Sequence, residues 1–135
     1  MSTEALQPEQ LFPSAPFGFS QVVVSTGSRH IHCAGQTAWD TEMQLVGGLD
    51  LGKQMRKALE NVGHALEAAG ASPANVVRTI IFVVDYQREY AEVIGQAMAE
   101  FFGTDRLPAS TLIGVQALAM PEFLVEVQAT AVIDE

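Results

Sequence analysis

A carboxylate within an apolar segment is the residue of this sequence with the clearest potential for chemistry. Residues 123–129 read Phe-Leu-Val-Glu-Val-Gln-Ala and alternate as a strand does, so Glu126 shares one face with Leu124 and Gln128. A carboxylate among aliphatic side chains is costly to bury unless it is paired or used. Two interpretations stay open: Glu126 lies at a solvated edge of a sheet, or it lies in a cleft where it orients water or accepts a proton.

The histidines and the single cysteine are weaker candidates. His30 and His32 have i, i+2 spacing, which places both imidazoles on one strand face, but no third metal ligand is evident nearby. His64 falls near the apolar stripe of a predicted helix, which favours packing or an interface over catalysis. Cys33 lies inside a predicted strand, with no cation or helix N-terminus to activate its thiol. We therefore expect neither a metal site nor a cysteine nucleophile.

Composition limits the partners that this chain can have. Its 135 residues include 7 Lys+Arg and 16 Asp+Glu, and the net charge of −9 opposes binding to nucleic acid or to anionic membranes. Hydrophobic residues make up 48% before the 11 glycines are counted, whereas ordinary soluble domains reach about 45–50% with glycine included. Charged residues make up only 17%, against about 25% in such domains. A chain this short has a limited interior, so the apolar excess indicates burial against another subunit. The single cysteine and the absence of a signal peptide favour a cytoplasmic location.

The pattern along the chain predicts elements in the order β-β-α-β-α-β-β within a single domain, residues 1–135. Residues 1–16 contain three prolines and are expected to lie extended over the surface. The first two strands are predicted to form a hairpin through a turn at 25–28, in which Gly27 is free to adopt positive φ. The predicted strands cover 19–25, 29–34, 76–85, 110–118 and 123–133, and the predicted helices cover 51–69, capped by Asp50, and 89–102.

These elements predict an α+β fold, with one mixed sheet and two helices packed on one face. Residues 76–85 read Val-Val-Arg-Thr-Ile-Ile-Phe-Val-Val-Asp, which is typical of a central strand covered on both faces. No further helix is predicted for the second face. We therefore expect another subunit to cover it.

Short motifs occur in a fixed order along residues 15–133. They are Phe19-Ser-Gln21, Ala34-Gly35-Gln36, Leu59-Glu-Asn-Val62, Leu66-Glu-Ala-Ala-Gly70, Phe101-Phe102, Leu107-Pro-Ala109 and Leu124-Val-Glu-Val-Gln-Ala129. Together they resemble the Rid proteins (reactive intermediate deaminases), also called the YjgF or L-PSP endoribonuclease family. The resemblance covers nearly the whole chain. It implies a chorismate-mutase-like α+β fold that assembles as a homotrimer, with ligand clefts between subunits.

The resemblance also implies a chemistry: hydrolysis of reactive enamines and imines to ketoacids and ammonia, without metal or cofactor. In the deaminating members an arginine after the Pro-Ala motif clamps the substrate carboxylate, and a carboxylate at the position of Glu126 orients water. Here Ser110 stands at the arginine position, which removes a charge-assisted bond of about 1.5–3 kcal/mol. The residues expected to bind substrate are Phe19, Gly35, Gln36, Ser110, Thr111 and Leu112, with Glu126 catalytic.

Three functions follow from this pattern. The first is a hydrolase that acts on a small carbonyl- or imine-derived metabolite through Glu126. The second is a non-catalytic ligand-binding or regulatory trimer, which the missing arginine favours. The third is an endoribonuclease or translation inhibitor, which the net charge of −9 opposes. A cation from a neighbouring subunit, Arg29, Arg78 or Arg106, could replace the missing arginine.

Overall fold

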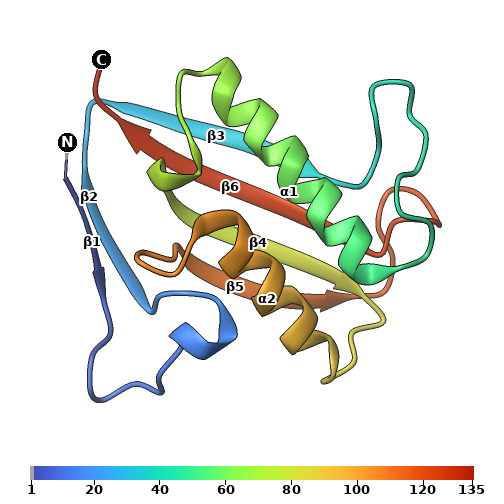
Figure 1. Cartoon of the computed structure of the whole chain (residues 1–135), viewed down its shortest axis with the longest axis horizontal. Helices are drawn as coiled ribbons and strands as arrows, with labels where there is room; N and C mark the ends of the chain where they lie inside the picture. The colour runs from blue at the N-terminus through green and yellow to red at the C-terminus, as the bar shows by residue number, and fades with distance from the viewer. Residues whose placement is uncertain (1) are drawn as a thin grey trace.

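The computed structural model describes residues 2–135 as a four-stranded mixed sheet with both helices on one face (Figure 1). The sheet order is β3-β6-β4-β5, in which β6 is antiparallel to β3 and β4 while β5 is parallel to β4. The predicted α+β class and helix packing are confirmed. The elements are β1 (Ser2–Leu6), η1 (Ala15–Phe17), β2 (Val22–Thr26), β3 (Arg29–Gln36), α1 (Leu51–Ala68), η2 (Pro73–Asn75), β4 (Val76–Val84), α2 (Tyr90–Phe102), β5 (Ala109–Val115) and β6 (Val125–Ile133).

Both helices form where the apolar periodicity predicts them. The Asp50 side chain accepts a hydrogen bond from the Lys53 backbone N–H at 2.9 Å and so caps α1. The apolar stripe of α1 and that of α2 bury against one face of β4 and β6. The largest side chains of this core include Met55, Leu59, Leu66, Met98, Val83, Val125 and Val127. No helix among residues 2–135 combines the length and the apolar character needed to span a bilayer.

The predicted hairpin between the first two strands is wrong. β2 pairs antiparallel with β1 in a separate two-stranded sheet, and β3 pairs with β6 instead. Part of the N-terminal segment that was expected to lie extended is thus a paired strand, which adds one strand to the predicted order. Gly27 does not have positive φ. Its lack of a side chain serves close packing, because a Cβ there would lie 2.5 Å from Val132 Cγ1.

The face of the four-stranded sheet away from the helices is only partly covered. β2 approaches β4 and β6 at one end, where Val132 is buried. Further along, Ile80 and Phe82 are half-buried and Ile113 is 39% exposed. Within residues 2–135, both helices lie on the opposite side (Figure 1). One chain therefore leaves an apolar strip on this face, which we call the open face.

A buried glutamine ties α1 to the loop that leads into β6. Gln54 is fully buried, and its Nε2 donates hydrogen bonds to the carbonyl oxygens of Gly48 at 2.8 Å and Glu122 at 2.9 Å. Its Oε1 accepts from the Leu124 N–H at 2.9 Å. The Gln54 amide would be costly to bury without these bonds. Gln54 thus fixes the start of the strand that carries Glu126.

Candidate functional site

The residues predicted to form the site are divided between the two faces of the sheet. In the register of β4 with β5, Ser110 lies beside Thr79 and Leu112 lies beside the core residue Ile81, so both lie on the helix face. Thr111 alternates to the open face and is exposed. Glu126 lies beside Phe82 on β4, also on the open face. The sheet therefore separates Ser110 and Leu112 from Glu126 within one chain.

A cavity of about 360 Å³ opens on the helix face beside β5. Its walls come from the N-terminal segment, α2 and β5, and include Phe12, Phe17, Phe19, Met98, Ser110 and Leu112. We call this cavity the aromatic pocket. It brings three predicted residues together: Phe19, Ser110 and Leu112. Phe12 and Phe17 were not predicted, because they lie in a proline-rich segment without strand or helix periodicity.

Ring contacts and one close backbone approach hold the aromatic wall in place. The ring of Phe12 meets those of Phe17 and Phe19 edge to face, each with centroids 6.1 Å apart. Gly18 has φ of +88° and rests on Gly95 of α2. A Cβ on Gly18 would lie 2.6 Å from the Gly95 carbonyl oxygen, and one on Gly95 would lie 2.7 Å from that of Phe17. Gly18 and Gly95 therefore let the backbone at Phe17 and Gly18 pack directly against the backbone of α2.

Gly95→Ala is expected to destabilise the protein and displace the aromatic wall. In an ordinary helix this change stabilises by about 1 kcal/mol, but here the new methyl group would clash with the Phe17 carbonyl oxygen. Gly63→Ala in α1 is the matched control, because its Cβ would meet Phe101 at an ordinary 3.5 Å. Thermal unfolding should show a lower Tm for Gly95→Ala and an equal or higher Tm for Gly63→Ala. A rise in both would contradict this account of the contact.

Ser110, which lines the aromatic pocket, forms a hydroxyl pair with Thr79 of β4. Thr79 Oγ1 donates a hydrogen bond of 2.7 Å to Ser110 Oγ, and Thr79 is only 1% exposed. Because Ser110 Oγ accepts this bond, its own proton is available to another acceptor. None of the described side chains that line the pocket carries a charge. The pocket is therefore apolar, with one hydroxyl donor.

Glu126 occupies a notch that only glycine leaves open. A Cβ at Gly35 would lie 2.2 Å from Glu126 Oε2, so the carboxylate fills the space where another side chain would begin. The register of β3 on β6 shifts between Cys33 and Gln36, which is the irregularity that brings Gly35 here. β6 lies between β3 and β4, so Glu126 is not on an edge strand. Among residues 2–135, no hydrogen bond or ion pair reaches its carboxylate.

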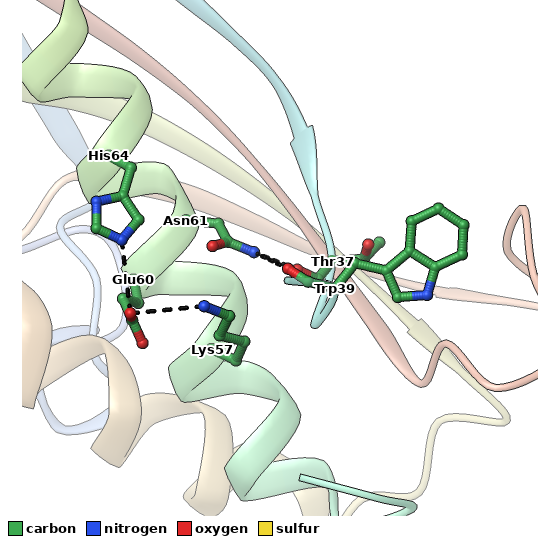
Figure 2. A network of polar contacts seen from close by, with 6 residues as sticks. All are labelled: Thr37, Trp39, Lys57, Glu60, Asn61 and His64. Carbon is green, nitrogen blue, oxygen red and sulfur yellow. Dashed lines mark hydrogen bonds and ion pairs between the residues drawn. The ribbon is translucent and has the colours of Figure 1, made fainter. Parts of the chain in front are cut away.

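A second cavity, of about 610 Å³, lies where β3 runs into the following loop. Gly35 and Gln36 line it together with Trp39, Asn61 and His64. The Asn61 Nδ2 donates to the carbonyl oxygens of Thr37 and Trp39, each at 2.9 Å, and so anchors the loop to α1 (Figure 2). In the register of β3 on β6, Gln36 lies beside the core residue Val127, so it lies on the helix side of the sheet, outside the aromatic pocket and across the sheet from Glu126.

Asp40 closes the same loop through hydrogen bonds to its backbone. His64, on α1, instead pairs with Glu60 at the surface. The Asp40 carboxylate accepts from the N–H groups of Gln44 and Glu42, and these bonds hold the pKa of Asp40 below its usual value. His64 Nε2 lies 3.5 Å from Glu60 Oε1, and the His64 side chain is 65% exposed (Figure 2). His64 is thus a surface residue on α1 rather than part of the packed core.

Comparison with known proteins decides the family. Residues 10–133 match the Endoribonuclease L-PSP family. The chain belongs to the Rid/YjgF/L-PSP family. A YjgF/YER057c/UK114 family protein from Mycobacterium tuberculosis is 33% identical with a TM-score of 0.65, over 98% of this chain and 100% of that one. A RutC family protein from Synechocystis is 31% identical over 121 residues, 88% of this chain and 89% of that protein.

A solved structure with a higher TM-score is that of YyfB from Yersinia pestis. It is described as a protein of unknown function of the conserved Rid family. It superposes with a TM-score of 0.94 at 41% identity and covers 98% of this chain and 100% of that one. The motifs that resembled the Rid family therefore identified both the family and the fold.

The remaining candidates of this Rid chain lie apart from both halves of the site. His30 and His32 share one face of β3, as predicted; this is the open face, and both are exposed. Within residues 2–135, no group of three or more His, Cys, Asp or Glu side chains could hold a metal ion. Burial raises the pKa of the Cys33 thiol, which keeps it protonated near neutral pH. Arg106 donates to the carbonyl oxygens of Ala74 and Val76, so its guanidinium is occupied.

Proposed function

We propose that this Rid protein hydrolyses a small imine-derived metabolite in a cleft between two copies of the chain. The observation that carries the proposal is the division of the site. The aromatic pocket with Ser110 and Leu112 lies on one face of the sheet, and Glu126 with Gly35 lies on the other. A molecule bound in the pocket can meet a Glu126 carboxylate only if a second copy supplies it.

The open face supports the presence of that second copy. Ile80, Phe82 and Ile113 form an apolar strip there that one chain leaves partly exposed. Covering such a strip is favourable at about 25 cal/mol for each Å² of apolar surface removed from water. The resemblance implies a homotrimer. If the pocket of one copy lies against Glu126 of its neighbour, cyclic symmetry repeats that contact and closes equivalent sites around the ring.

The proposed reaction uses one proton acceptor and one donor. Glu126 takes a proton from water as the water oxygen bonds to the imine carbon. Glu126 passes this proton to the imine nitrogen, which gives a neutral carbinolamine. Glu126 then accepts the hydroxyl proton of the carbinolamine and delivers it to the nitrogen as the C–N bond breaks, so that ammonia leaves and a carbonyl compound remains. Ser110 donates a hydrogen bond that holds the substrate. Neither step requires a metal or a cofactor.

Mixing the protein with freshly generated imines tests this activity. The panel should include 2-aminoacrylate, iminopropionate and imines of uncharged ketones, with ammonia and carbonyl release measured against buffer. We expect faster release for the uncharged members, because no described cation lines the pocket to hold a carboxylate. Release no faster than in buffer for every member would overturn the hydrolase proposal.

A non-catalytic ligand-binding protein is the second candidate. It is favoured by the same pocket, whose described lining contains no titratable group that could act as acid or base. In that case a ligand raises Tm by mass action while no product forms. An endoribonuclease has less support, because phosphate binding needs the basic surface that a chain of net charge −9 does not offer.

A further inference from the structure

We propose that the aromatic pocket takes an uncharged, largely apolar molecule with a single hydrogen-bond acceptor, of the class of aryl or branched alkyl ketones and their imines. The inference rests on the proposed function, because the pocket is one half of the proposed cleft. It goes further by naming the chemical class that the pocket selects. Three properties of the pocket carry it: size, charge and the Ser110–Thr79 hydroxyl pair.

The size of the pocket suits a small ring with a short substituent. Its volume is about 360 Å³, at the lower end of the roughly 300–1,000 Å³ of small-molecule sites. A cavity of about 150 Å³ already holds benzene. The wall offers flat and flexible apolar surfaces, Phe12, Phe19 and Met98, which suit an aromatic or branched group.

The lack of a cation in its described lining makes the pocket unfavourable for anions. No Lys or Arg is among the described residues that line it, and a carboxylate that loses water without gaining a cation pays a large desolvation penalty. Arg106 cannot turn inward without leaving the carbonyl oxygens of Ala74 and Val76. No carboxylate lines the pocket either. An ammonium ligand would therefore rely on phenylalanine faces alone, the weakest class of cation–π partner together with tyrosine.

The hydroxyl pair selects for one acceptor. Thr79 Oγ1 donates to Ser110 Oγ at 2.7 Å, so the Ser110 proton is the hydrogen that can point to a ligand. A carbonyl oxygen or imine nitrogen satisfies it. A hydrocarbon leaves the proton unpaired in an apolar setting, which costs affinity.

The test uses the full chain labelled with 13C at the methionine methyl groups. Met98 lines the aromatic pocket and reports occupancy, whereas Met43 is 66% exposed, does not line the pocket and serves as the internal control. The probes are acetophenone, ethylbenzene, benzoate and phenyltrimethylammonium. We expect acetophenone to shift the Met98 resonance but not that of Met43. Ethylbenzene should bind about three- to tenfold more weakly, and benzoate more than about a hundredfold more weakly.

Two variants separate the hydrogen bond from the wall. Ser110→Ala should remove the advantage of acetophenone over ethylbenzene, whereas Phe12→Ala should weaken both equally. Phe12 is 57% exposed, so we expect its truncation to leave the folded core intact. Phe12→Ala therefore still tests the pocket if Ser110→Ala does not fold. Leu49→Ala, at an exposed leucine outside the pocket, should change neither affinity.

Several results would overturn the inference. They are tighter binding of benzoate or phenyltrimethylammonium than of acetophenone, and no shift of Met98 by any probe. Loss of benzoate binding in Arg78→Ala would further point to a cation supplied by a neighbouring copy. Imine hydrolysis without a preference for uncharged substrates would leave the proposed function standing and this inference wrong. Acetophenone binding without hydrolysis of any imine would support the inference and remove the hydrolase proposal.

Discussion

Glu126→Gln is expected to lower the rate of imine hydrolysis by about a hundred- to ten-thousand-fold, the usual contribution of a positioned general base. The amide has the size of the carboxylate but cannot take a proton from water at neutral pH. No described hydrogen bond or ion pair depends on the Glu126 carboxylate, and the side chain is partly exposed. We therefore expect the fold and the Tm to change little while turnover is lost.

Glu67→Gln is the matched control for this change. Glu67 is an exposed carboxylate on α1, outside the two cavities that hold the predicted site residues. Ammonia release by Glu67→Gln should stay within about twofold of the parent, because no reacting group is removed. A Glu126→Gln protein that keeps parent activity would show that another group handles the proton. A Glu126→Gln protein with a much lower Tm would assign Glu126 a structural role instead.

Sequence periodicity predicted the helices well because the signal is local. The stripe from Leu51 onward and the Asp50 cap placed α1, and β4 was recognised from its continuous apolar run. Strand pairing is a different problem. Val22 to Val24 indicate a strand but carry no information on its partner, and the partner turned out to be residues 2–6, a short segment without a β-branched run. The predicted hairpin failed for that reason.

The site shows the same division between local and tertiary information. Ordered motifs selected Phe19, Ser110 and Leu112, which meet in one pocket, and Gly35 with Glu126, which meet at one notch. Which side of the sheet each group faces follows from the register of β5 on β4 and of β6 on β4, which no motif specifies. Gly95 did leave a signal. A glycine inside a helical stripe often marks close packing, and here the Phe17 backbone fills the space.

Mixing two inactive variants should restore activity if the cleft joins two copies of the chain. Glu126→Gln keeps the aromatic pocket but lacks the proton acceptor, whereas Leu112→Trp keeps Glu126 but fills the pocket with a bulky ring. Each protein alone should be inactive. The two proteins are unfolded together and reassembled in equal amounts. About half of the sites then have an intact pocket, and about half of those face an intact Glu126 on the neighbouring chain, so about a quarter of the sites are complete. Ammonia release should therefore recover to about a quarter of the parent rate.

The control for this mixture is the Leu112→Trp chain that also carries Glu126→Gln. Mixed with the Glu126→Gln chain, it supplies no carboxylate and should restore nothing, although mixed oligomers form equally well. Sedimentation of the mixtures establishes that assembly took place. Mixed oligomers without recovered activity would place the whole reaction within one chain, and that result would conflict with the sheet that lies between Ser110 and Glu126. Recovery would instead make the open face a catalytic surface, because its burial brings the two halves of the site together.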